Sequence, residues 1–118
     1  MTPVFNYEAS LRRMGQDGQL FREMIGLISE DAPRLLGDVV NGLEERNAER
    51  VRHAAHTLKG LSANFSALRA MEAAERLEQR ARAGNWEELE RTHADLNDAI
   101  HELLSALQPL TAQTSASI

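Results

Sequence analysis

The sequence predicts an all-α protein, an antiparallel up-down four-helix bundle with a short additional N-terminal helix. Three observations predict this fold. Apolar residues recur at helical spacing along nearly the whole chain of 118 residues. No segment has the strict alternation of apolar and polar residues that a half-buried strand requires. Turn and capping residues separate the amphipathic segments by only a few positions, and short connections place successive helices antiparallel.

Composition limits the classes of function. The length suits one domain, and 42% hydrophobic with 26% charged residues is an ordinary globular balance. A net charge of -5 disfavours binding to nucleic acid or to anionic membranes. The chain has no cysteine, which excludes disulfides and thiolate metal sites. With no signal peptide or membrane-spanning stretch evident in the sequence, we expect a monomeric, cytoplasmic protein.

The first half of the chain holds two expected helices. A short helix is expected over residues 7–14, ended by Gly15. A second begins near Asp17, and Pro33 must either kink it or break it in two, because proline removes a backbone donor and clashes with the preceding turn. Its apolar residues at helical spacing are Phe21, Met24, Ile25, Ile28, Leu35, Val39 and Leu43.

Two more helices are expected in the middle of the chain. Asn47 is a candidate N-cap for a helix over residues 48–64. The next helix is expected over residues 67–83 and ends at Gly84, a residue type that favours helix C-termini. The residues of this helix expected to face the core are Leu68, Met71, Ala74, Leu77 and Ala81.

The last helix begins with a pattern that resembles a capping box, Asn85 followed three positions later by Glu88. It carries Trp86, Leu89, Leu96, Ile100, Leu103 and Leu107. We therefore expect a bundle domain over residues 1–108 and a flexible C-terminal tail over residues 109–118, which is small and polar.

The segment "HAAHTLKGLSANF" holds the most informative residues of the chain. At about 100° per residue, one stripe of its helix carries Val51, Ala55, Leu58, Ser62 and Phe65 and faces the bundle. His56 lies roughly 160° from the centre of this stripe and is expected to point into solvent. Arg52, His53, Lys59, Gly60 and Ala63 share its face.

The neighbours of His56 suit an exposed nucleophile. Lys59 is the only lysine in the chain, and three positions after His56 its ammonium can reach a negative group held on the imidazole. Gly60 and Ala63 leave a low surface on which a partner protein could approach the ring, although a mid-helix glycine costs about 0.5–1 kcal/mol. No acidic residue on this face is placed to act as a general base.

The stretch "AHTLKGLSANF" resembles the signature of the histidine-containing phosphotransfer (HPt) domain of bacterial phosphorelays. His56, Leu58, Lys59, Gly60, Ser62 and Phe65 match that pattern. The resemblance implies that His56 accepts a phosphoryl group from the aspartyl phosphate of a receiver domain and passes it to a second receiver aspartate. Lys59 would help to neutralise the group, and Gly60 would leave room for it and for the docked receiver.

The resemblance also implies what the domain lacks. The protein would be a phosphocarrier without kinase activity or a cofactor of its own, since Mg²⁺ and most catalytic groups belong to the receiver. A hybrid sensor histidine kinase is a possible partner. Many family members have glycine where this chain has Ser66, which could cap the next helix, so we expect altered turn geometry there.

Alternative interpretations stay open for several residues. The same face could serve a non-catalytic adaptor bundle that only binds a partner, and Arg52 and His53 could be either docking residues or simply solvated. Glu90 and His93 have the spacing of carboxylate-bridged metal sites, but no second such pair faces them, so we expect no metal. His93 is expected to be a buried or half-buried structural histidine, with His101 at the rim.

Overall fold

The computed structural model describes residues 3–116 of the chain, with side chains described up to Thr111. Its secondary structure consists of five α-helices, and no strand occurs within the described residues, as predicted. The helices are α1 (Tyr7–Arg13), α2 (Gly18–Glu44), α3 (Ala48–Ala63), α4 (Leu68–Ala83) and α5 (Trp86–Ala116).

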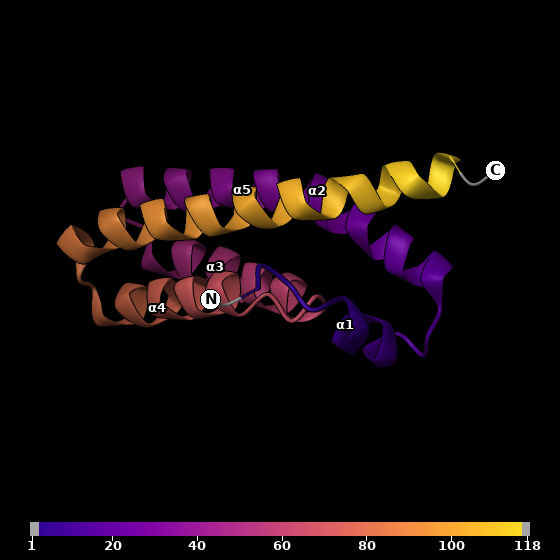
Figure 1. Ribbon diagram of the computed structural model, residues 1–118. Helices are drawn as coiled ribbons and strands as arrows, with labels where there is room; N and C mark the ends of the chain where they lie inside the picture. The colour runs from indigo at the N-terminus through magenta and orange to yellow at the C-terminus, as the bar shows by residue number, and fades with distance from the viewer. Residues whose placement is uncertain (1–2, 117–118) are drawn as a thin grey trace.

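Helices α2 to α5 form an elongated four-helix bundle, and α1 packs at the end where α2 begins (Figure 1). Helix α3 contacts both α2 and α4, and α5 closes the bundle against α4 and α2. The overall dimensions are 48 × 25 × 23 Å. Each of the helices α2 to α5 therefore has two bundle neighbours and one face left for solvent, as an up-down bundle requires.

Side-chain caps fix the starts of four helices. The side chains of Asn6, Asp17 and Asn47 each accept a hydrogen bond from the backbone N–H three residues later. Asn85 accepts in the same way from the N–H of Glu88 at 3.4 Å. These bonds satisfy donors that have no partner inside the helix, and they confirm Asn47 and Asn85 as cap residues.

The core contains the expected stripe of α3, because Val51, Ala55, Leu58, Ser62 and Phe65 are all buried. The stripe expected on α4 is only partly correct. Its members Ala74, Leu77 and Ala81 are buried and Met71 is half-buried, but Leu68 is 51% exposed. Leu68 is the first residue of α4, where the chain is still leaving the turn after α3, so helical spacing does not yet place it against the core.

Two prolines lie inside continuous helices. Pro33 lies within α2, so a break into two helices is wrong. Helix α5 continues past Pro109 to Ala116, beyond the expected end of the bundle domain at residue 108. Leu107 is buried and Leu110 packs against the core, and this apolar contact continues past the proline. Whether residues 109–118 are flexible stays a prediction, and residues 117 and 118 lie outside the described part.

None of the helices in the described residues combines the length and the apolar character that a membrane span requires.

Candidate functional site

His56 lies in the middle of α3 and its side chain is 60% exposed. The residues that hold α3 in the bundle, such as Val51, Ala55 and Leu58, are fully buried on the opposite side of the helix. The outward orientation of His56 predicted from the helical wheel is thus confirmed, and a reacting partner has access to the ring.

A buried carboxylate from the neighbouring helix contacts this exposed ring. Glu78 of α4 is only 5% exposed, and its Oε2 lies 3.2 Å from Nδ1 of His56. The expectation that no acidic residue on the face of α3 could act as a general base did not consider α4, which supplies this carboxylate. A neutral imidazole that donates its Nδ1–H to Glu78 has its lone pair on Nε2.

Three cations surround the same carboxylate. Nζ of Lys59 lies 3.4 Å from Oε1 of Glu78, and guanidinium nitrogens of Arg82 and Arg52 lie 3.3 Å and 3.7 Å from Oε2. Burial alone would raise the pKa of Glu78, but the charges of Lys59, His56 and Arg82 outweigh it and lower the pKa below its usual value. Glu78 is therefore ionised at neutral pH and holds Lys59 and Arg82 near the ring.

The predicted docking residues Arg52, His53 and Ala63 lie on the same helix, and only Arg52 of these belongs to the cluster around Glu78. Arg52 also pairs with Glu49, with its Nε 3.1 Å from the carboxylate. His53 is exposed, and its backbone carbonyl accepts a hydrogen bond from the Thr57 hydroxyl. The carbonyl of Ala63 accepts a hydrogen bond of 2.5 Å from Arg13, so α1 is tied to the end of α3.

Gly60 has no packing role inside the molecule. A Cβ built at Gly60 would meet no atom within 4 Å, whereas one at Gly42 would lie 2.7 Å from Cγ2 of Val51. Gly42 therefore permits the close approach of α2 and α3. No neighbouring atom requires a glycine at position 60 in the same way. The open space beside Gly60 excludes a helix crossing as the explanation of this residue.

Ser66 adopts a left-handed backbone conformation, with φ of 50°. The N–H of Ser66 donates to the carbonyl of Ala63, and the N–H of Ala67 donates to that of Ser62. These two bonds form a Schellman turn, whose left-handed position usually holds glycine. The expected capping role of Ser66 is wrong, since the N-cap of α4 is Ala67 and no side chain caps that helix.

No group of three or more histidine, aspartate or glutamate side chains in the described residues could hold a metal ion. His93 is half-buried as expected. His101 is exposed, and its Nδ1–H donates to the backbone carbonyl oxygen of Asn97 at 2.8 Å. Nε2 of His93 is buried without a hydrogen-bond partner, and burial lowers the pKa of this ring.

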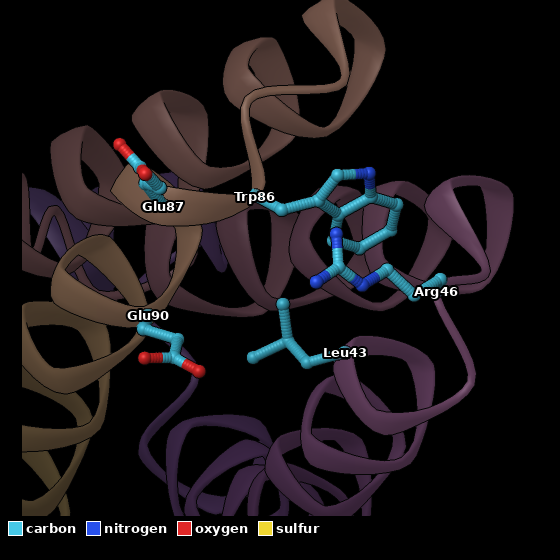
Figure 2. Close-up of a pocket in the computed structure, with 5 residues that line it drawn as sticks. All are labelled: Leu43, Arg46, Trp86, Glu87 and Glu90. Atoms are coloured by element: carbon cyan, nitrogen blue, oxygen red, sulfur yellow. The ribbon is translucent and has the colours of Figure 1, made fainter.

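Glu90 belongs to a different region, a cavity of about 330 Å³ where α2 ends and α5 begins (Figure 2). The guanidinium of Arg46 lies 5.4 Å from the ring centroid of Trp86 in this cavity. The half-buried Trp86 thus packs at a helix end.

Sequence reasoning missed Glu78 and Arg82, although the sequence holds a sign of both. Glu78 lies four residues after Ala74 and seven after Met71, on the edge of the stripe that was expected to face the core. A carboxylate in that position needs a cationic partner, and Arg82 follows at i+4. What the sequence could not supply was the pairing of this edge of α4 with the His56 face of α3.

Comparison with known proteins identifies the family. The sequence model of the Hpt domain matches residues 23–108. The structure resembles that of histidine-containing phosphotransfer protein B (HptB) from Pseudomonas aeruginosa PAO1, with a TM-score of 0.87 and 17% identity over 96% of this chain and 98% of that one.

It also resembles the HPT domain of the Hpt sensor hybrid histidine kinase from Shewanella, with a TM-score of 0.81 and 18% identity over 93% of this chain and 95% of that one. No curated protein matches the chain significantly. Because the family match covers well over half of the sequence, the chain belongs to the Hpt domain family and is a histidine phosphotransfer protein of phosphorelays.

Proposed function

We propose that His56 is the phosphoryl acceptor and that it reacts through Nε2. The observation that carries this assignment is the contact of a buried carboxylate with Nδ1 of an otherwise exposed ring. Nδ1 lies against the carboxylate of Glu78 at 3.2 Å, while the side chain as a whole is 60% exposed. A ring held in this tautomer offers the Nε2 lone pair to an approaching electrophile without a separate general base.

In this proposal the phosphoryl group arrives from the aspartyl phosphate of one receiver domain and leaves to the aspartate of a second. Lys59 neutralises part of its charge, and Arg82 adds a second cation, since both pair with the carboxylate that contacts the ring. Mg²⁺ and the other catalytic groups come from the receiver. The protein is a phosphocarrier that supplies the nucleophile and the docking surface.

The docking surface consists of Arg52, His53, Gly60 and Ala63 around His56. Gly60 contributes open space, since no atom lies within 4 Å of the position of its missing Cβ. Arg52 is 27% exposed and contributes a positive charge beside the ring. A receiver with an acidic aspartate pocket suits this combination of clearance and cations.

The test is transfer of label from a receiver domain phosphorylated with ³²P. We expect acid-labile label on the wild type and on His101→Gln, and none on His56→Gln. His101 is the matched control because it is an exposed histidine of α5, outside the docking surface. Label on His56→Gln would show that the acceptor is another residue. A purely adaptor bundle would bind receivers equally with and without His56 and would never carry phosphohistidine.

A further inference from the structure

We propose that the negative charge of Glu78 keeps the proton on Nδ1 of His56 after the ring is phosphorylated, so that the P–N bond always breaks from a protonated ring. This inference rests on the proposed function, in which Nε2 of His56 is the acceptor. It assigns Glu78 a role as a positioning residue that acts on the phosphorylated state and not only on the free ring.

The chemical steps balance without any proton transfer to or from the ring. The Nε2 lone pair attacks phosphorus, and the electrons of the P–O bond leave with the aspartate carboxylate of the first receiver. The product ring carries the phosphoryl group on Nε2 and its original proton on Nδ1, and it is cationic. When a second aspartate attacks phosphorus, the electrons of the P–N bond return to Nε2 and leave a neutral ring.

The cationic ring needs a counter-charge, and Glu78 supplies it at the required atom. Its Oε2 is 3.2 Å from Nδ1, and the residue is 5% exposed, so water screens the interaction weakly. A neutral amide at the same place could accept the Nδ1–H bond but would not offset the positive charge. The lowered pKa of Glu78 keeps the carboxylate ionised at neutral pH.

The other charged groups around Glu78 determine how much of its negative charge is available to the protonated ring of His56. Lys59 and Arg52 face it from α3 and Arg82 from α4, and Arg52 also pairs with Glu49. In the free protein these cations offset the carboxylate. A phosphoryl group on Nε2 competes for Lys59, whose 3.4 Å contact with Glu78 is long for a hydrogen bond. As Lys59 turns to the phosphoryl group, more of the charge of Glu78 is left to the protonated ring.

The experiment compares the wild type with Glu78→Gln after chemical phosphorylation with phosphoramidate, which needs no receiver. The protein is labelled with ¹⁵N at histidine, and the ¹⁵N shift of Nδ1 reports its protonation. At pH 7.5 we expect a protonated Nδ1 in the phosphorylated wild type and an unprotonated one in Glu78→Gln. The variant should also lose its phosphoryl group about tenfold more slowly, because the P–N bond breaks more readily when Nδ1 of the ring is protonated.

Glu72→Gln is the matched control, since it removes an exposed carboxylate from the same helix outside the network of Glu78. It should behave as the wild type. An unprotonated Nδ1 in the phosphorylated wild type, or a protonated one in Glu78→Gln, would overturn the inference while His56 remained the acceptor. Phosphohistidine at a residue other than His56 would instead overturn the proposed function itself.

Discussion

Gly60 and His56 lie one helical turn apart on α3, and only one of them has a partner in the molecule. His56 contacts Glu78, while the position of a Cβ on Gly60 is surrounded by open space. A glycine inside a helix lowers stability by about 0.5–1 kcal/mol relative to alanine. Since packing does not require Gly60, the reason for it must lie in what approaches the helix from outside.

Replacement of Gly60 tests that reason. We expect Gly60→Ala to raise the free energy of unfolding by about 0.5–1 kcal/mol. Gly60→Gln should slow phosphoryl uptake from a receiver about tenfold or more, because a side chain there displaces the docked partner. Gly26→Gln is the control. A Cβ at Gly26 would also meet no atom within 4 Å, and this glycine lies on α2 beside a cavity between α2 and α5. Equal rates for the two glutamine variants would contradict the docking role.

Ser66 gives a second prediction at this scale. A left-handed conformation costs a residue with a Cβ roughly 1–2 kcal/mol, and glycine avoids this cost. Glycine also has more conformational entropy in the unfolded chain, which offsets part of the gain in stability. With φ of 50° at Ser66, we expect Ser66→Gly to increase stability by about 0.5–1 kcal/mol in chemical denaturation. Ser66→Ala, which keeps the Cβ, should give no such gain. A loss of stability in Ser66→Gly would show that the serine hydroxyl makes an essential contact.

The helices differ in how far their sequences predict them. The stripe of α3 and the caps Asn47 and Asn85 were predictable, because they depend on local spacing and local hydrogen bonds. The continuation of α5 past Pro109 was not, since it depends on contacts of Leu107 and Leu110 with the rest of the core. The role of Glu78 required knowing which edge of α4 meets α3, which is a property of two helices together.

Helix pairing also leads to a prediction at Gly42. A Cβ there would lie 2.7 Å from Cγ2 of Val51 and 3.2 Å from its backbone N, so α2 and α3 would have to separate. We expect Gly42→Ala to destabilise the protein by about 1–3 kcal/mol, measured by urea denaturation. Gly37→Ala, in the same helix with open space around it, should be neutral or stabilising. The account of α2–α3 packing fails if both variants have the same stability.

For the molecule as a whole, the half-buried His93 and the buried Glu78 contribute to the dependence of stability on pH. Burial lowers the pKa of His93 below its usual value of about 6.5, so the unfolded chain binds this proton first as the pH falls. The stabilising contribution of neutral His93 is complete above about pH 6.5 and is lost as the pH falls towards the lowered pKa. Glu78, with its pKa lowered from 4.5, contributes a separate loss only below about that pH.

Unfolding measured at several pH values separates these contributions. We expect the wild type to lose stability as the pH falls below about 6.5, and His93→Leu to lose much less. His101→Gln, which removes an exposed histidine, should retain the loss. If the pH profile of His93→Leu were the same as that of the wild type, protonation of His93 would not be the source of the loss of stability.

The central claim is that Nε2 of His56 carries the phosphoryl group because Nδ1 is engaged by Glu78. The most direct measurement is a two-bond ¹H–¹⁵N spectrum of the histidine rings combined with ³¹P detection after phosphorylation. The account predicts a single phosphorylated ring, that of His56, with phosphorus bonded to Nε2. Phosphorus on Nδ1 of His56, or on the ring of His53, His93 or His101, would contradict it.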